Sequence, residues 1–303
     1  MSAEKRSNQF LLKTMKNSFF STFKNLQNPF AKSVTRLFVG AMLVMATACD
    51  KAEDMNPSLE TQEYDQATKA TTYYGPAKPM GNGVARTWVT VSKEGAPTAI
   101  GVAMSEKALT NLPQGEGQQH DGHHVYETVL DFPKAAALTP FRFMTLDWNP
   151  HGHEPANVYE KPHFDFHFYM ISDELRKTIP GLAPTELDPA PPAPAYLPAD
   201  YIMTPGRIPA MGTHFVDATS PELHGHPFVQ TFIYGGYQGE VIFYEPMITL
   251  DYIASKPQAT IPIKQPAAFQ KEGYYPQSYR VEYDTKRKEH RIYLADLTHQ
   301  QAQ

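Results

Sequence analysis

Imidazole and carboxylate side chains gather in one short stretch of this chain, residues 147–170. The stretch includes Asp165 and holds four of the twelve histidines, which are His151, His153, His163 and His167. Such side chains can hold a divalent metal ion or carry protons in acid–base catalysis. A functional site is therefore expected here first.

Polar and apolar side chains alternate from His163 to Tyr169. The polar positions are His163, Asp165, His167 and Tyr169, and phenylalanine fills each position between them. Successive side chains on a β-strand point to opposite faces, so the pattern predicts a strand with one polar face and one phenylalanine face. A helix is the weaker interpretation, because it would spread the phenylalanines around its axis and would begin beside Pro162.

Strand geometry limits which of these residues can share a metal ion. Side chains two positions apart are separated by about 6.6 Å, and side chains four positions apart by about 13 Å. His163 and His167 are therefore not expected to share an ion unless it lies directly above Asp165. The expected site is Asp165 with one neighbouring histidine, completed from the preceding loop or from residues 213–217. The candidate ligands of zinc or a similar divalent metal are His151, His153, His163, Asp165, His167 and His214, with Glu154 and Asp217 as further alternatives.

Two other interpretations of this cluster stay open. In a metal-dependent lyase, isomerase or hydrolase, Asp165 or a histidine would carry the proton and Tyr169 would assist. In a structural protein, the same side chains would form a hydrogen-bonded network that braces loops. The sequence lacks the motifs G-x-S-x-G, G-x-x-x-x-G-K-[ST] and H-E-x-x-H, which disfavours a hydrolase of standard type.

The first 48 residues have the composition of an export signal. Seven basic residues and one acid precede the apolar run 37–48, which is too short to span a bilayer. The run leads into Cys49 through Ala-Thr-Ala, an arrangement that resembles the lipobox of bacterial lipoproteins, in which the cysteine is lipidated. We expect residues 1–48 to be a lipoprotein signal peptide and Cys49 to anchor the chain to a membrane of the bacterial cell envelope, on its periplasmic or surface side. Plain secretion is the alternative.

Charge and cysteine content narrow the function classes further. Seven of the 27 basic residues and one of the 32 acids lie in residues 1–48, so the other 255 residues carry 20 bases against 31 acids. This acidic balance makes nucleic acid an unexpected partner. Cys49 is the only cysteine, which excludes disulfides and cysteine zinc sites from the exported domain. Residues 49–72 are polar and acid-rich and are expected to be a flexible tether.

Short β runs separated by glycine, proline and asparagine dominate the rest of the chain. The expected strands are 84–92, 98–105, 124–132, 141–149, 163–172, 228–235, 240–245, 279–283 and 290–297. Many strands and few helices favour a barrel or a sandwich, and we expect a single antiparallel β-barrel over residues 73–298.

Turns, short helices and one long loop complete the expected domain. Glycines at 235–239 and charged residues at 284–288 predict hairpin turns. Short helices are expected at 105–111 and 172–179, the second capped by Ser172. Nine prolines in residues 180–209 predict a long loop or lid within one domain.

Five motifs stand out together: DWNPHGHEP (147–155), PHFDFHFY (162–169), MGTH (211–214), TFIYGGYQG (231–239) and EPMIT (245–249). In combination they resemble a family of exported bacterial β-barrel proteins classed as a domain of unknown function, over about residues 75–255. The resemblance implies a β-barrel and allows a homo-oligomer, and it brings no activity with it. Cupins, whose metal histidines lie on barrel strands, are a weaker comparison because their ligand spacing is not reproduced.

These observations favour a membrane-anchored envelope protein that binds a metal ion or another small ligand at the His/Asp cluster. The metal-dependent enzyme and the non-catalytic structural or oligomer-forming protein are the alternatives.

Overall fold

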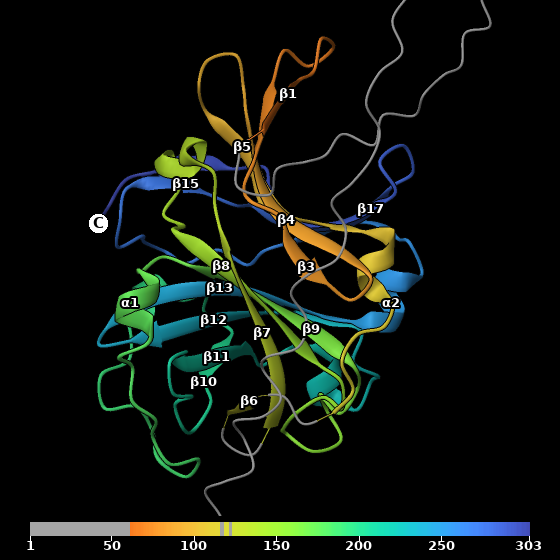
Figure 1. The fold of residues 1–303 in the computed structure, drawn as a ribbon. Helices are drawn as coiled ribbons and strands as arrows, with labels where there is room; N and C mark the ends of the chain where they lie inside the picture. The colour runs from red at the N-terminus through yellow and green to blue at the C-terminus, as the bar shows by residue number, and fades with distance from the viewer. Residues whose placement is uncertain (1–60, 116–117, 121–122) are drawn as a thin grey trace, which may run out of the picture. The chain divides into compact units, whose positions relative to one another are not determined.

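Two large antiparallel sheets make up the fold of this computed structural model, which describes residues 61–115, 118–120 and 123–303. The strand order is β1-β2-β4-β5-β17-β16-β14 in the first sheet, with β3 beside β4, and β10-β11-β12-β13-β9-β8-β7-β6 in the second. Figure 1 shows β4, β5 and β17 of the first sheet above β8, β9, β12 and β13 of the second.

The strands have the following bounds. The first sheet contains β1 (Thr61–Tyr64), β2 (Thr71–Tyr74), β3 (Lys78–Met80), β4 (Gly83–Val91), β5 (Pro97–Ser105), β14 (Gln258–Pro262), β16 (Ser278–Asp284) and β17 (Glu289–Ala295). The second contains β6 (Gln118–His120), β7 (His123–Asp131), β8 (Phe143–Asn149), β9 (His163–Tyr169), β10 (Tyr201–Met203), β11 (Thr213–Asp217), β12 (Gln230–Tyr237) and β13 (Glu240–Thr249). A small third sheet pairs β15 (Gly273–Tyr275) with β18 (Thr298–Gln300).

Helices are short and lie between strands. The α-helices are α1 (Asp173–Arg176) and α2 (Leu250–Ala254), and the 3₁₀ turns are η1 (Glu106–Leu109), η2 (Lys134–Leu138), η3 (Pro194–Tyr196) and η4 (Pro221–His224). Ser172 caps α1 by accepting a hydrogen bond from the backbone N–H of Leu175, as its sequence position predicts.

The main hydrophobic core lies between the two large sheets. Phe164, Phe166 and Phe168 of β9 are fully buried in it, together with residues of the first sheet such as Ile100 and Ile292. The rings of Phe232 on β12 and Tyr279 on β16 meet across it at 5.4 Å. The phenylalanine face expected from the alternation of β9 is therefore the face that joins the sheets, and its polar face points away from this core.

Each expected β run overlaps a strand of the structure, and the mainly β class is confirmed. The single closed barrel is not confirmed, because the pairings among the described strands form separate open sheets. Alternation along a strand reveals its apolar face, but it does not reveal whether the outer strands of a sheet meet. Glycines 235 and 236 belong to β12, where the register shifts between them, and the hairpin turn falls at Gln238 and Gly239.

The described part of the expected tether is paired. β1 and β2 form a hairpin, and β2 pairs in turn with β4, so strand pairing begins ahead of the expected domain start at residue 73. Tyr74 anchors the hairpin, because it is buried against Trp88 in a small apolar cluster. The signal segment, Cys49 and residues 49–60 lie outside the described residues.

The proline-rich excursion 180–209 is mostly loop, as expected, with η3 and β10 inside it. Its ends are tied together by a bridge between Leu182 and Arg207. In the part of the chain that the structure describes, no helix combines the length and the apolar character needed to cross a membrane.

Candidate metal centre

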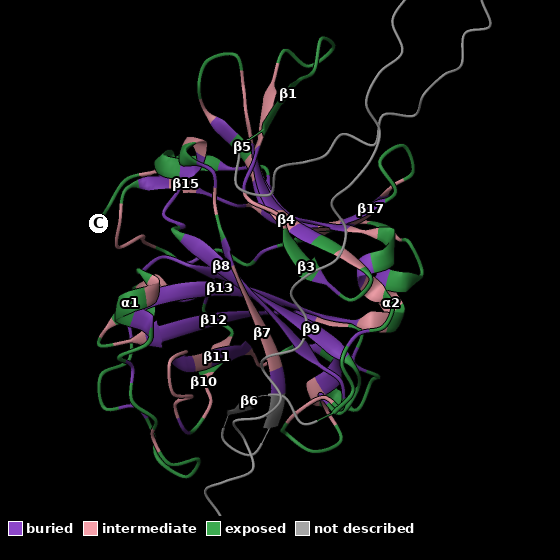
Figure 2. Cartoon of the chain, in the orientation of Figure 1, coloured by how far each residue is buried: buried purple, intermediate pink, exposed green. Residues whose placement is uncertain are grey.

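The polar face of β9 is the centre of the candidate site. β9 lies between β8 and β13, and the register places Asp147 of β8 opposite Asp165 and Asn149 opposite His163. All residues of β8 and β9 are buried, which Figure 2 shows as continuous purple along these strands. Polar groups on this face are therefore shielded from water and need partners within the protein or a bound ion.

Apolar side chains cover one end of this polar face. Phe228 packs edge-on against the imidazole of His163, with ring centroids 5.4 Å apart, and Tyr159 packs against Phe228 at 5.0 Å. Both aromatic residues are buried in a cluster with Met247 of β13. The loop that follows β8 and the segment before β12 thus close over the histidines and lower the local dielectric.

A first group of potential ligands is formed by His153, His163 and Asp165. The Nε2 atom of His163 lies 3.2 Å from Oδ1 of Asp165, and the Nε2 atom of His153 lies 3.7 Å from Oδ2. These distances exceed the donor–acceptor distance of about 2.7–2.9 Å that is typical of a charge-assisted hydrogen bond. They are close to the separation of about 3.4 Å between two ligands that bind one zinc ion tetrahedrally at about 2.1 Å.

Hydrogen bonds at the far side of each ring orient the two imidazoles. Nδ1 of His163 lies 2.6 Å from the carbonyl oxygen of Lys161, and Nδ1 of His153 lies 2.7 Å from that of Glu154. A carbonyl oxygen only accepts, so each Nδ1 carries the proton and donates it. In the neutral rings each Nε2 lone pair then faces Asp165, and this arrangement is repulsive unless a proton or a metal ion lies between the groups.

Two atoms of this group are buried without a hydrogen-bond partner: Nε2 of His163 and Oδ1 of Asp165. The other oxygen of Asp165 accepts a hydrogen bond of 2.7 Å from Nδ2 of Asn149. The carboxylate is thus held on one side by an amide and left open on the side of the histidines.

A second group is formed by His167, His214 and Glu245, which come from β9, β11 and β13. Oε2 of Glu245 lies 3.5 Å from Nε2 of His167 and 3.7 Å from Nε2 of His214. On the other side of its ring, Nδ1 of His167 lies 3.2 Å from Oδ2 of Asp147.

Burial and neighbouring charges shift the pKa values of the first group. Burial alone would raise the pKa of Asp165, but the nearby charges of His163 and His153 hold it below its ordinary value. Burial would lower the pKa of His153, and its contacts with Asp165 raise it instead. In this group the carboxylate stays ionised well into the acid range.

The second group behaves differently, because burial favours the protonated forms of Glu245 and of the neighbouring Asp147. Burial raises the pKa of Glu245 to about 8, against the opposing charge of His167, and burial also raises the pKa of Asp147. Burial would lower the pKa of His167, but Glu245 and Asp147 raise it to about 9. Burial and the charges of His167 and His153 lower the pKa of His214 to about 3.

The positive charge available to these carboxylates is limited. Among the residues that the structure describes, no lysine or arginine forms an ion pair with Asp147, Asp165 or Glu245. Arg176, which lies nearby over the ring of Tyr169, instead pairs with Glu127 and Asp173. Bound protons, protonated histidines or bound cations must therefore balance the three buried carboxylates.

Most of the sequence-predicted ligands therefore meet in two groups. His153, His163 and Asp165 form the first group, and His167 and His214 belong to the second, so His163 and His167 are in different groups. His151 is in neither group: it is exposed, and its Nε2 lies 3.2 Å from the carbonyl oxygen of Gln114. Of the further alternatives, Glu154 is exposed and Asp217 pairs with Lys264, so neither joins the site.

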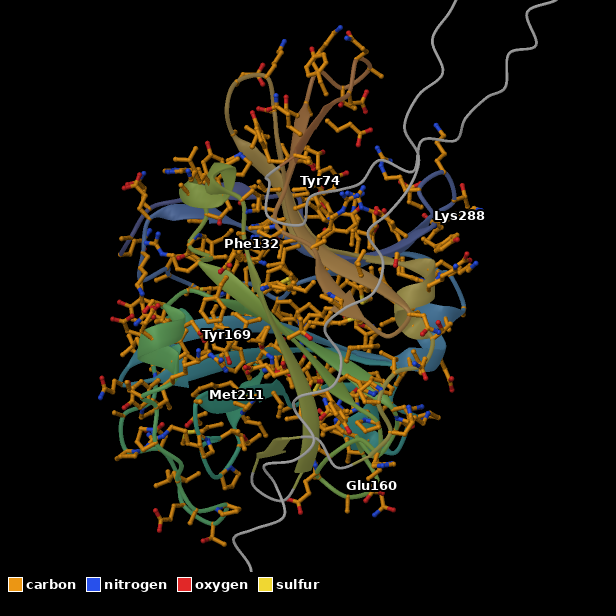
Figure 3. The ribbon with its side chains drawn as sticks, viewed as in Figure 1. Tyr74, Phe132, Glu160, Tyr169, Met211 and Lys288 are labelled. Atoms are coloured by element: carbon orange, nitrogen blue, oxygen red, sulfur yellow. The ribbon has the colours of Figure 1, made fainter. Side chains whose placement is uncertain are left out.

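Tyr169, which is labelled in Figure 3, is the last residue of β9 on the same face and belongs to neither group. It is fully buried, its ring stacks on Phe143 at 4.9 Å, and its hydroxyl has no hydrogen-bond partner. Burial raises its pKa well above the ordinary value, so the hydroxyl stays protonated. The assisting role expected for Tyr169 has no hydrogen bond to support it: its ring stacks on that of His167 at 5.7 Å, but its hydroxyl reaches neither group.

Three residues of the candidate site were not predicted from the sequence: Asp147, Asn149 and Glu245. All three lie inside the motifs that begin DWNP (147–150) and EPMIT (245–249). The available signal was an acid or amide within a run of otherwise buried strand residues, because such a group needs a specific partner.

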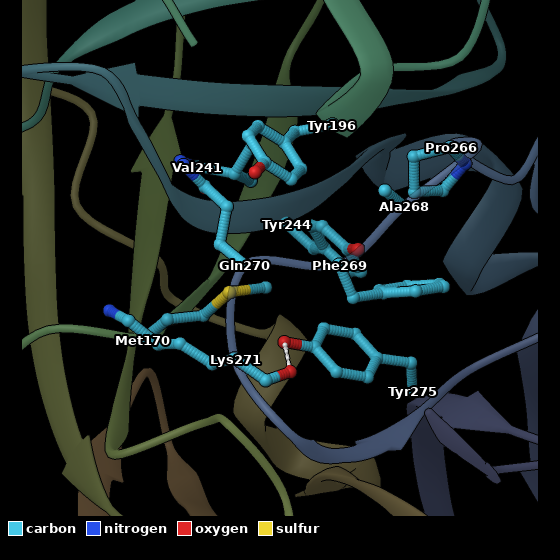
Figure 4. Close-up of a pocket in the computed structure, with 10 residues that line it drawn as sticks. All are labelled: Met170, Tyr196, Val241, Tyr244, Pro266, Ala268, Phe269, Gln270, Lys271 and Tyr275. Carbon is cyan, nitrogen blue, oxygen red and sulfur yellow. Dashed lines mark hydrogen bonds between the residues drawn. The ribbon is translucent and has the colours of Figure 1, made fainter. Parts of the chain in front are cut away.

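A small cavity lies elsewhere in the described residues. It is lined largely by aromatic and apolar residues, including Met170, Tyr244, Phe269 and Tyr275, and the hydroxyl of Tyr275 donates to the carbonyl oxygen of Lys271 (Figure 4). Its volume of about 20 Å³ has room for little more than one water molecule. The polar face of β9 is therefore the stronger candidate for a functional site.

Comparison with known proteins gives a partial family match. Residues 92–148 are similar to the family described as TTHB210-like, hypothetical protein TTHB210. The match runs from β5 to β8 and includes Asp147, but it ends before the histidines of β9. No curated protein and no solved structure shows significant similarity to the chain. The match fits a domain of unknown function, and the site must be interpreted from its own geometry.

Proposed function

We propose that this protein binds a divalent transition metal ion, zinc or a similar ion, through His153, His163 and Asp165. The observation that carries this proposal is the unpartnered pair of buried atoms, Nε2 of His163 and Oδ1 of Asp165, 3.2 Å apart. A metal ion between them would satisfy both atoms. Without a partner, each buried polar atom raises the free energy of the folded state. Imidazole and carboxylate are also the ligands that zinc uses in proteins.

The proposal places the site in an envelope protein. The basic and apolar N-terminal segment and Cys49 support export and lipid anchoring at the periplasmic or surface side. Mass spectrometry of the mature N-terminus tests this part: a diacylglyceryl modification on Cys49 is expected, and an unmodified terminus contradicts it.

A metal-dependent enzyme is the second candidate. Three protein ligands leave a coordination position open for water or substrate, as in catalytic zinc sites. His153 supports access to that position, because its side chain is 23% exposed while His163 is fully buried. Such a site favours hydrolysis or a lyase or isomerase reaction at a carbonyl or phosphoryl group.

Metal binding by an Asp165→Asn variant tests the proposal. The asparagine can still accept from Asn149, and its N–H₂ group can donate to Nε2 of His163, so the fold should survive. If Asp165 binds the ion, the affinity of the chelator-treated variant for Zn²⁺ should fall at least about 100-fold. Substitution of residues that only hydrogen-bond to metal ligands already lowers metal affinity by about 10–100-fold.

Asp251→Asn, an exposed aspartate of α2, is the matched control and should bind Zn²⁺ like the parent. A bracing network predicts the opposite result: a parent protein that binds no Zn²⁺ and an Asp165→Asn variant destabilised by about 1–3 kcal/mol. That outcome would exclude the metal site and leave the structural alternative.

A further inference from the structure

The second group of the polar face, His167, His214 and Glu245, has the same composition as the first: two imidazoles and one carboxylate. Its three side chains come from three different strands, so only the folded sheet brings them together. Oε2 of Glu245 lies 3.5 and 3.7 Å from the two Nε2 atoms, which is too long for good hydrogen bonds. Both distances are close to the separation of about 3.4 Å between two atoms that bind the same zinc ion.

Two buried atoms point into this group without partners, Nε2 of His167 and Oε2 of Glu245. Behind His167, the carboxylate of Asp147 lies 3.2 Å from Nδ1, and the hydroxyl of Thr145 lies 3.3 Å from the same atom. A carboxylate behind the far nitrogen of a metal-binding histidine fixes its tautomer and makes Nε2 a better ligand.

Charge balance favours a cation here in addition to one in the first group. A divalent ion held by Asp165 leaves Asp147 and Glu245, two further buried carboxylates, on either side of His167. Without an ion, these two carboxylates must keep bound protons or share the single imidazolium of His167, because the described residues offer them no lysine or arginine. A divalent ion at the second group would balance them.

We propose that His167, His214 and Glu245 form a second metal site for a divalent transition ion, with Asp147 as a positioning residue. The site deepens the proposed function, since His163, Asp165 and His167 share one face of β9 and set the two sites side by side along that strand. Its ligands are separate from those of the first site, so the two can be lost one at a time.

The test is the stoichiometry of Co²⁺ binding by the chelator-treated full chain, followed by its visible absorption and by calorimetry. The parent should bind two Co²⁺ ions per chain. Glu245→Gln should bind one and His163→Gln should bind one, because each variant removes a ligand of a different site. His299→Gln, which changes an exposed histidine outside both groups, should bind two.

The outcomes separate the two proposals. A parent that binds one ion, lost in His163→Gln and kept in Glu245→Gln, overturns the second site and leaves the first. One ion that is lost in Glu245→Gln and kept in His163→Gln supports the second site and overturns the first, and no bound ion overturns both. Should Glu245→Gln fail to fold, His214→Gln replaces it, because this ligand is partly exposed and its loss disturbs the sheet least.

Discussion

Asp165 uses its two carboxylate oxygens for different purposes. Oδ2 accepts a hydrogen bond from Asn149, and Oδ1 faces His163 without a hydrogen bond. The amide of Asn149 therefore fixes the rotation of the carboxylate, and this rotation decides where Oδ1 lies. Asn149 is a positioning residue in this arrangement, since it contacts the ligand and not the proposed ion.

Asn149→Ala should weaken Zn²⁺ binding at the first site by about 10–100-fold without changing the number of ions bound, because all ligands remain. Competition with a chelator of known affinity measures the change. Asn82→Ala, at an exposed asparagine that bonds to Thr110, is the control. Unchanged affinity in Asn149→Ala would show that the carboxylate needs no such support.

At the scale of the elements, the pairing of β12 with β13 positions an aromatic ring against the two histidines of the second group. Gly235 of β12 lies opposite Phe243 of β13. The ring of Phe243 packs edge-on against His167 at 4.9 Å and near His214 at 5.4 Å. A Cβ atom at position 235 would come within 2.0 to 2.3 Å of that ring, so the glycine makes room for the aromatic wall of the site.

Gly235→Ala should therefore push Phe243 against the two histidines, lower the free energy of unfolding by about 1–3 kcal/mol, and weaken Co²⁺ binding at the second group. Denaturant unfolding and Co²⁺ titration measure the two effects, and the first group should keep its ion. Gly115→Ala serves as the control, because a Cβ atom there meets only the hydroxyl of Tyr126 at 3.5 Å. A variant as stable as the parent, with two bound ions, would contradict this role of Gly235.

At the scale of the whole molecule, the buried titratable groups link stability to pH. Glu245, with a pKa raised to about 8, and His167, with a pKa raised to about 9, bind protons more tightly in the folded chain than in the unfolded one. Such groups stabilise the fold at low pH and lose this contribution as pH rises. His214, with a pKa lowered to about 3, acts in the opposite direction and costs stability below about pH 6.5.

Thermal unfolding of the metal-depleted chain should therefore show a melting temperature that falls between about pH 6.5 and 8, where Glu245 and His167 contribute and the raised pKa of His153 acts in the same direction. Excess Zn²⁺ should oppose the fall, because metal ligands bind in their deprotonated forms. Glu245→Gln removes one titrating group and should flatten the curve. A melting temperature that rises with pH over this range in the metal-depleted parent would contradict the buried, protonated carboxylate.

Local sequence patterns determined much of the secondary structure. The alternation from His163 to Tyr169 is set by the two-residue period of a strand, so both its strand character and its phenylalanine face could be predicted. The cap at Ser172 could be predicted because a helix N-terminus leaves backbone N–H groups without partners. The sequence does not predict β2 and β11, although Thr, Tyr, Phe and Val favour strands, because runs of four and five residues are too short to show a clear period and their pairing decides them.

The tertiary structure alone decided how the histidines are grouped. The sequence placed Asp165 next to two histidines on one strand, but it could not show that His153 joins it from a loop or that Glu245 approaches His167 from β13. It also could not show whether the sheets close, since closure depends on how the edge strands lie in space. Strand period is a local property of the backbone, whereas a ligand set from several strands depends on sheet order and register, and these are fixed only when the core packs.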